Sequence, residues 1–295
     1  MGDFILSCCS AVDLTAEQME ELGISYVPFH YELGGTDYVD DLGVTVPYDE
    51  FYRRMVAGED TKTSQVNVEE FVNYFEKYLK EGKDVLHLTL SSGISGTLNS
   101  AKLAKDMLEE KYPDRRLYIV DSLAASGGYG LLMWELAEMK NSGKDIDEVY
   151  DYAEKHKKQL NHWFFTTDLT FFIRGGRVSK TAGFVGTMLN ICPLLNVDYM
   201  GRLIPREKIR TKKKVINRIV DIMEEKAFNG KDYDGKVLIT HAHCYDDAKA
   251  VADLIEERFP KQKGRVKINY IGNLIGAHTG PGTVALFFWG DERVN

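Results

Sequence analysis

Cysteine is scarce in this 295-residue sequence, which has four, at positions 8, 9, 192 and 244. Adjacent Cys8 and Cys9 cannot readily bridge each other, and the spacing of the four resembles no disulfide framework. The first residues lack the basic region and apolar length of a signal peptide, and no window approaches the roughly 20 apolar residues of a membrane-spanning helix. These absences predict reduced thiols, a cytoplasmic location and no integral membrane association.

An excess of positive charge is also lacking, since 37 basic residues face 45 acidic ones and the formal net charge is −8. Nucleic acids and anionic membranes attract proteins that carry a positive field, so this balance argues against both as general partners. Hydrophobic residues make up 44% of the sequence and charged residues 28%, which excludes intrinsic disorder and fibrous repeats. The length accommodates one large or two ordinary domains.

The first half of the sequence alternates strand and helix patterns. Val85–Leu90 and Leu117–Val120 are apolar runs typical of buried parallel strands, and each precedes a loop and a helical pattern. Repetition of this unit predicts a Rossmann-like α/β domain with a mainly parallel sheet over residues 1–160. Alternating apolar residues at 27–33 predict one half-exposed strand, within a small antiparallel excursion near residues 25–50.

The second half has a different pattern. A polar, lysine-rich helix is expected at 144–159, and short apolar strands are expected at 237–240, 266–271 and 284–289. Closely spaced strands of this kind favour a mixed or antiparallel sheet with helices on one face. We therefore expect a smaller α+β domain over residues 161–295.

Four hydroxyl- and glycine-rich segments are candidates for holding an anion. Ser91–Thr97 joins a buried strand to a helix, where unpaired backbone N–H groups and the helix dipole favour a negative charge. It is neither a dinucleotide-binding nor a Walker A motif, since it lacks the lysine of the latter. The other three are expected as loops at the same sheet edge, where open α/β sheets bind ligands. They are Thr61–Ser64, Asp121-Ser122 with Ser126-Gly127-Gly128, and Gly276–Gly282.

Among the histidines, His278 is the strongest candidate for a ligand contact, because glycines and Thr279 surround it in the sequence. His241 and His243 have the alternation of a zinc-binding pair, but no second cluster lies at a suitable spacing, so we expect no metal site. Asp40-Asp41 could pair with a catalytic group, but a solvated turn is the preferred interpretation.

A basic stretch, Lys208–Lys214, stands out on an acidic protein. It is interpreted either as a solvated helix face or as a docking site for a phosphate-bearing partner. In the second case the contacts would be Arg174, Arg177, Lys208 and Arg210, because the guanidinium fork suits phosphate.

Taken in order, these motifs resemble those of the DegV family of bacterial fatty-acid-binding proteins over essentially the whole length. The matching segments are Thr63-Ser64-Gln65, Ser91–Thr97 with Ser100-Ala101, Asp121-Ser122, Arg174-Gly175-Gly176-Arg177, Leu189-Asn190-Ile191 with Pro193, Lys208 with Arg210, and His278–Gly282. Each motif is weak alone, whereas their order and spacing together are highly specific.

The resemblance implies an α/β N-terminal domain joined to a smaller α+β C-terminal domain, with one long-chain fatty acid in a tunnel between them. It also implies that the protein is the binding subunit of a two-part fatty acid kinase. Such a subunit presents the carboxylate to a separate ATP-binding kinase subunit, which forms an acyl phosphate for phospholipid metabolism. No cofactor and no activity of the chain alone are implied, and contact with a membrane would be transient at most.

Carried over by position, the family's carboxylate-binding residues match Thr63, Ser95 and His278. The residues expected to support them in the same loops are Ser64, Ser92, Gly96, Thr97, Thr279 and Gly280. Arg174 and Arg177 lie in the family's G-G-R motif, and Lys208 and Arg210 in its K-x-R motif, which implies a phosphate- or kinase-facing role. One departure concerns the head-group network: Cys9 stands before Ser10 where the family has aspartate.

The apolar wall of the tunnel is expected from four segments. They are Phe164-Phe165, Phe171-Phe172-Ile173, Met188-Leu189 and Leu194-Leu195. The alternative from another class is a serine hydrolase or acyltransferase using Ser95 and His278. Against this alternative, the sequence lacks the G-x-S-x-G elbow of such enzymes and a clearly placed acid to orient the histidine. A third interpretation is a binding module for another phosphorylated or carboxylated small molecule, in a wider and wetter pocket.

Overall fold

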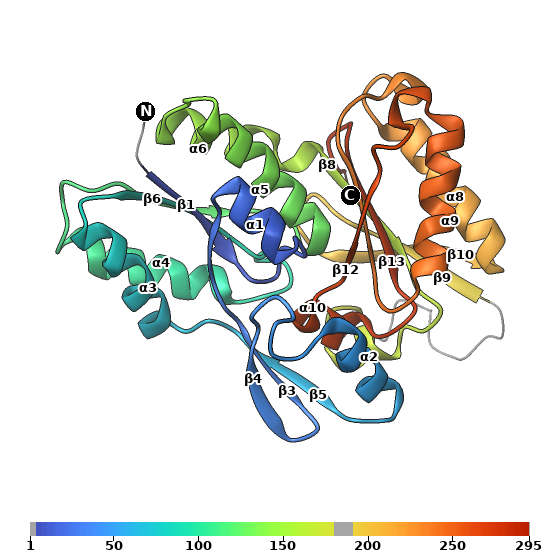
Figure 1. The fold of residues 1–295 in the computed structure, drawn as a ribbon, viewed down its shortest axis with the longest axis horizontal. Helices are drawn as coiled ribbons and strands as arrows, with labels where there is room; N and C mark the ends of the chain where they lie inside the picture. The colour runs from blue at the N-terminus through green and yellow to red at the C-terminus, as the bar shows by residue number, and fades with distance from the viewer. Residues whose placement is uncertain (1–3, 180–190, 295) are drawn as a thin grey trace.

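Two β-sheets with their covering helices lie side by side, and a third, smaller sheet projects next to them (Figure 1). The computed structural model describes residues 4–179 and 191–294. The N-terminal sheet is α/β and parallel and the C-terminal sheet is mixed, as the sequence predicts.

The first sheet has four strands in the order β2-β1-β6-β7, and all of its pairs are parallel. The strands are β1 (Phe4–Cys9), β2 (Ser25–Val27), β6 (Asp84–Thr89) and β7 (Leu117–Asp121). Its helices are α1 (Ala16–Leu22), α3 (Val68–Lys80), α4 (Thr97–Glu109), α5 (Ser126–Asn141) and α6 (Ile146–His156). Helices α3 and α4 pack against one another and on β6 and β7, whereas α1, α5 and α6 form a second packed group.

The small sheet is antiparallel and has the order β4-β3-β5. It consists of β3 (His30–Leu33), β4 (Thr36–Val39) and β5 (Thr61–Ser64), with α2 (Tyr48–Val56) between β4 and β5. Two predictions are therefore wrong. The strand expected at 27–33 is divided between two sheets at Pro28, which has no N–H for a ladder. The excursion also extends to Ser64, so that Thr61–Ser64 is a strand rather than a loop.

The second sheet has six strands in the order β10-β9-β8-β13-β11-β12. They are β8 (Leu160–Phe165), β9 (Ile191–Val197), β10 (Leu203–Arg210), β11 (Val237–His241), β12 (Lys267–Tyr270) and β13 (Val284–Trp289). Only the β11–β12 pair is parallel among them. Helices α8 (Lys212–Lys226) and α9 (Tyr245–Arg258) pack together on this sheet, as expected for helices on one face. Lys208 and Arg210 belong to β10, so the basic stretch is a strand end and a helix start rather than one helix face.

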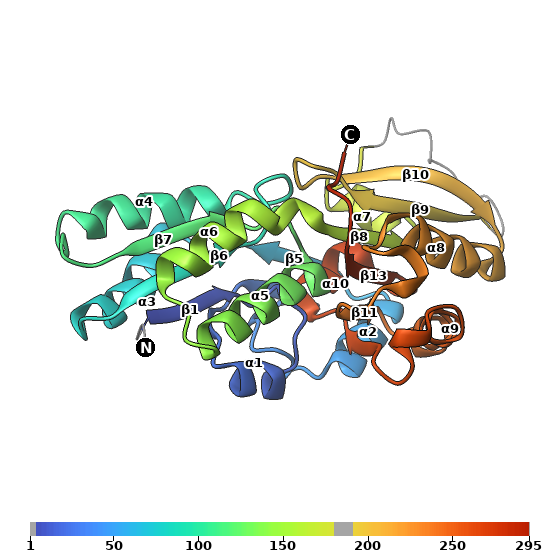
Figure 2. The same cartoon turned by 90° about the horizontal axis from the view of Figure 1, so that it is seen from above.

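Helix α5 connects the two sheets, because it packs on β1 and also on β8, β11 and β13 (Figure 2). Its first turn is glycine-rich for a steric reason. A Cβ at Gly127 would lie 2.8 Å from the Phe287 ring, and one at Gly128 would lie 2.5 Å from the His162 ring. Ser126-Gly127-Gly128 is therefore the start of a helix, which corrects the prediction of a loop.

The division into domains at residue 160 coincides with the start of β8 at Leu160. One continuous hydrophobic core extends through both sheets. The division into domains 1–160 and 161–295 stays a prediction. Two short helices, α7 (Thr170–Arg174) and α10 (Asn273–Thr279), pack against each other and complete the part of the fold that surrounds the candidate functional site. Within the described ranges, no helix is long and apolar enough to cross a membrane.

Candidate functional site

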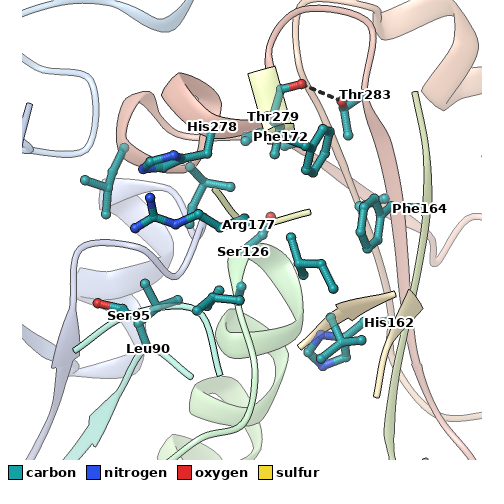
Figure 3. A pocket seen from close by; sticks show the side chains of 18 of the residues that line it. Leu90, Ser95, Ser126, His162, Phe164, Phe172, Arg177, His278, Thr279 and Thr283 are labelled. Carbon is teal, nitrogen blue, oxygen red and sulfur yellow. Dashed lines mark hydrogen bonds between the residues drawn. The ribbon is translucent and has the colours of Figure 1, made fainter. Parts of the chain in front are cut away.

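A cavity of about 460 Å³ lies where the two large sheets and the small sheet meet. This volume is within the range typical of small-molecule sites. Its apolar wall consists of Phe29, Leu90, Ile94, Ala125, Phe164, Phe172, Val197, Leu203, Ile271, Leu274, Ile275, Ala285 and Phe287. Its other lining residues are Thr63, Gln65, Ser95, Gly96, Ser126, His162, Arg177, His278, Thr279 and Thr283. Figure 3 shows His278, Arg177 and Ser95 toward one side and Phe164 and His162 toward the other.

Thr63 and His278 meet at the polar side of the cavity. Strand β5 carries Thr63 and α10 carries His278, and Oγ1 of Thr63 lies 2.8 Å from Nε2 of His278. His278 stands in the last turn of α10 rather than in a loop, and the chain leaves the helix at Gly280 with φ of 68°. A Cβ at Gly175 would lie 2.5 Å from Nδ1 of His278, so this glycine of the R-G-G-R segment makes room for the imidazole.

The imidazole of His278 is neutral in this environment. Burial and then the positive charges of Arg177 and Arg174 lower its pKa to about 4. Its Nδ1 is buried and has no hydrogen-bond partner among the described residues. A neutral imidazole with one free ring nitrogen can hydrogen-bond an incoming ligand without bringing a charge of its own.

Ser95 lies at the start of α4, on the loop that follows β6. Its Oγ accepts a hydrogen bond from the N–H of Thr97 at 3.3 Å, which leaves its hydroxyl hydrogen for another acceptor. Helix α4 begins after Gly96 without a side-chain cap, so its first N–H groups add positive potential beside Ser95. Gly96 also allows Gln65 to approach, because a Cβ there would lie 2.8 Å from Oε1 of Gln65.

Arg177 supplies a cation to the cavity. The sequence predicts a partner-facing role for it, whereas its side chain is half-buried and lines the cavity. Nη1 donates to the carbonyl of Gly175 at 2.5 Å, and burial lowers the pKa of its guanidinium. Arg174 is exposed instead, since its guanidinium lies 4.9 Å from the centre of the Phe171 ring and pairs with Asp60 at 3.2 Å. The two arginines of one motif therefore point to different environments.

The predicted supporting residues divide into two groups. Gly96 and Thr279 line the cavity, and Oγ1 of Thr279 is buried without a partner in the described structure. The others do not line it: Ser64 is exposed because successive strand residues point to opposite faces. Ser92 is held by Asp121, with Oγ donating at 2.5 Å. Thr97 and Gly280 complete this second group, Thr97 buried in α4 and Gly280 closely packed against Phe171.

Lys208 and Arg210 are exposed at the far end of β10. Leu203, at the near end of the same strand, lines the cavity. At about 3.3 Å per residue, Arg210 lies roughly 23 Å further along the strand. The structure therefore does not bring Lys208 and Arg210 to the cavity wall.

Ser126, from a segment expected to hold an anion, lines the cavity, and so do Gln65, His162 and Thr283, to which the sequence assigns no role in the site. Gln65 lies in the Thr63-Ser64-Gln65 motif of the family, whereas His162 lies inside an apolar strand and has no local signal. Of the predicted apolar wall, Phe164 and Phe172 line the cavity and stack at 5.7 Å. Phe165, Phe171, Ile173, Leu194 and Leu195 do not, and Met188-Leu189 lies outside the described residues.

The geometry does not form a hydrolase triad. Nε2 of His278 contacts Thr63 rather than Ser95, and no carboxylate of the described chain contacts its Nδ1. His241 and His243 also do not form a metal pair: His241 contacts the N–H of Cys244 and His243 contacts Asp49. In residues 4–179 and 191–294, no group of three or more His, Cys, Asp or Glu residues is arranged to hold a metal ion.

Two further titratable side chains near the site, the carboxyl of Asp40 and the thiol of Cys9, are buried. Asp40 is 3% exposed, which corrects the prediction of a solvated turn, whereas Asp41 caps the turn by accepting from the N–H groups of Val44 and Thr45. Cys9, in the position of the family's aspartate, is fully buried, and its Sγ lies 3.7 Å from Nε2 of His87. Burial raises the pKa of Cys9 to about 12, so no anionic acceptor replaces the missing carboxylate.

The fold and the site together define an α/β protein of two packed sheets that enclose an apolar cavity with a polar end. The chain belongs to the DegV family: the family model described as "Uncharacterised protein, DegV family" matches residues 9–291. A DegV domain-containing protein of Clostridium perfringens is 38% identical over 293 residues, which are 99% of each chain.

Solved structures of the family agree with the fold. A DegV lipid-binding protein from Thermotoga maritima is 30% identical and aligns with a TM-score of 0.84 over 99% of both chains. A DegV family protein from Thermus thermophilus, described for its fatty acid binding, is 26% identical and aligns with a TM-score of 0.85 over 98% of this chain and 100% of its own. The structural neighbours of this chain are thus fatty-acid-binding DegV proteins.

Proposed function

We propose that this protein binds one long-chain fatty acid, with the acyl chain in the apolar part of the cavity and the carboxylate at its polar end. The observation that carries the proposal is a cavity that has Ser95, Arg177 and His278 toward one side and Phe164 toward the other (Figure 3). Thr63 also lines this cavity, next to His278. The lipid binding described for the relative from Thermotoga maritima and the fatty acid binding described for the relative from Thermus thermophilus support the same ligand class.

The energetics are consistent with this ligand. Each buried methylene contributes about 0.8 kcal/mol, so a chain of roughly 14 methylenes contributes on the order of 11 kcal/mol before costs. Burying a carboxylate costs several kcal/mol unless it is paired and hydrogen-bonded. Arg177 provides the paired charge. The hydroxyls of Thr63 and Ser95, the first N–H groups of α4 and the free nitrogen of His278 provide hydrogen-bond partners.

We further propose that the carboxylate is presented to a separate ATP-dependent kinase subunit. A carboxylate oxygen would attack the γ-phosphorus of ATP, and the bond to the leaving ADP would break, giving an acyl phosphate. This chain would position the acceptor, and the kinase subunit would supply the nucleotide site. The exposed Arg174, Lys208 and Arg210 are the candidate contacts with that subunit. This step rests on the family resemblance, whereas the cytoplasmic location rests on the sequence alone.

Mass spectrometry of lipid released from the purified protein by denaturing extraction tests the binding step. We expect about one long-chain fatty acid per chain and no covalent adduct. Recovery of a water-soluble carboxylated or phosphorylated compound instead would favour the wider-pocket interpretation. An adduct on Ser95 would favour the hydrolase.

The kinase step needs a separate experiment. The protein loaded with palmitate is incubated with ATP and hydroxylamine, with and without the kinase subunit, and the trapped acyl hydroxamate is measured. We expect product only when both proteins are present. Product formed by this chain alone would show that the division of labour is wrong.

A further inference from the structure

His162 is a buried polar side chain in the apolar part of the cavity. It lies on β8, is 1% exposed and lines the cavity together with its neighbour on β13, Phe287. The two rings meet edge to face with their centres 5.4 Å apart. The edge of the imidazole that carries both nitrogens faces α5, where Gly128 has no Cβ to displace it: a Cβ there would lie 2.6 Å from Nε2 and 2.9 Å from Nδ1. An apolar side chain at this position would need no polar partner, yet the fold accommodates an imidazole here.

Neither ring nitrogen of His162 has a hydrogen-bond partner among the described residues. The ring is neutral, because burial and the nearby Arg293 hold its pKa well below the usual range. A neutral imidazole carries one donor and one acceptor, and leaving both unpaired in a buried position is costly. A partner from outside the chain would remove this cost.

The start of α5 lies on the same wall. Ala125 and Ser126 line the cavity, and α5 begins after Ala125 without a side-chain cap. The hydroxyl of Ser126 is already used, since it donates to Asp13 and lies 3.0 Å from Oγ1 of Thr240. His162 therefore remains the side chain of this wall with unused hydrogen-bonding capacity, and the helix start adds a positive potential that favours an oxygen atom.

We propose that His162, next to the start of α5, is a polar subsite inside the acyl part of the cavity, which takes a fatty acid carrying a hydroxyl group part-way along its chain. The inference rests on the proposed function and names the substrate class within it. The hydroxyl donates to the unprotonated ring nitrogen of His162 or accepts from the protonated one. The position of the hydroxyl along the chain decides whether it reaches the ring.

The test measures the binding of stearic acid and of a series of octadecanoic acids with one hydroxyl at successive positions. The wild-type protein, stripped of lipid, is expected to bind one positional isomer about tenfold more tightly than stearic acid, as for one buried hydrogen bond that satisfies an unpaired group. The isomers on either side should bind less tightly than stearic acid, because they bury an unpaired hydroxyl.

Two variants assign the preference to His162. His162→Leu should abolish the preference and retain stearic acid binding, whereas His162→Gln, which keeps a donor and an acceptor, should retain part of the preference. Phe164→Leu is the matched control in the same strand and wall, and it should leave the preference unchanged. Thermal unfolding of each variant shows whether it is folded. The isomer series with the wild-type protein tests the proposal even if a variant does not fold.

The outcomes separate the inference from the proposed function. Equal or weaker binding of every hydroxylated isomer than of stearic acid overturns the subsite and leaves fatty acid binding intact. Retention of the preference by His162→Leu also overturns it. Failure of stearic acid and of all isomers to bind would instead contradict the proposed function.

Discussion

Thr63 and His278 are 215 residues apart in the chain, and their side chains meet at 2.8 Å. The contact joins the small antiparallel sheet to α10. The same interface is fixed by Asn273, which donates to Tyr31 at 3.0 Å, and by Tyr52, which donates to the carbonyl of Ile271 at 2.8 Å. The polar end of the cavity therefore exists only when the excursion packs on the C-terminal part of the chain.

The first prediction concerns the hydroxyl donors. Ser95→Ala should weaken the binding of palmitate by about ten- to a hundredfold, because a hydrogen bond to a charged group contributes about 1.5–3 kcal/mol. Thr63→Val should have a smaller effect, since Thr63 also contacts His278. Calorimetry with delipidated protein measures both. Ser64→Ala, on the opposite face of β5, is the control and should bind like the wild type. Unchanged affinity in Ser95→Ala would remove Ser95 from the head-group site.

The second prediction separates the two arginines of the R-G-G-R segment. Arg177 lines the cavity and Arg174 does not, so Arg177→Gln should weaken palmitate binding by at least about tenfold while Arg174→Gln leaves it unchanged. The kinase assay should respond to Arg174→Gln if that residue contacts the partner subunit. Equal effects of both substitutions on binding would contradict the placement of the carboxylate beside Arg177.

Much of this arrangement follows from local sequence. The apolar runs before Ser91 and Asp121 predict β6 and β7, and of the glycine and hydroxyl residues that follow them, Ser95, Gly96 and Ser126 line the cavity. The small sheet was harder to predict, because β5 is polar and its pairing with β3 depends on contacts far along the chain. His162 has no local signal at all, since its role depends on Gly128 of another element. Arg177 and Arg174 are indistinguishable by motif, and only packing separates them.

The third prediction concerns stability in mild acid. The folded-state pKa of His278 is about 4, below the ordinary value near 6.5, so the unfolded chain binds more protons between these pH values. The free energy of unfolding should therefore fall as the pH falls from about 6.5 to about 4, and His278 should account for about 1–3 kcal/mol of this loss. In His278→Asn, the free energy of unfolding should depend less steeply on pH over this range. Urea unfolding of delipidated protein at a series of pH values measures this slope. An unchanged slope would mean that the imidazole is solvated in the folded state.

The fourth prediction has the opposite sign. Burial raises the pKa of Asp40 to about 7, and Ser10 is its hydrogen-bond partner. The folded state therefore retains a proton that the unfolded state loses between about pH 4 and pH 7, so this group destabilises the protein as the pH rises through that range. Asp40→Asn should raise the free energy of unfolding at pH 8 by about 2–4 kcal/mol and change it little at pH 4. A loss of stability at pH 8 would show that the ionised carboxylate is paired.

The fifth prediction uses the apolar wall to set the length of the acyl chain. Ala285 lies on β13 opposite Phe164, is 5% exposed and lines the cavity, so a larger side chain there occupies space that the ligand would fill. Ala285→Leu should shift the bound acids toward shorter chains, and each excluded methylene should cost about 0.8 kcal/mol of binding free energy. Mass spectrometry of the extracted lipid and competition between palmitate and shorter acids measure the shift. Ala248→Leu on α9, which lies outside the cavity wall, is the control for overpacking. A leucine at position 285 would shorten the space for any acyl chain that runs along β13. If folded Ala285→Leu keeps the chain-length distribution of the wild type, the acyl chain therefore does not run along β13.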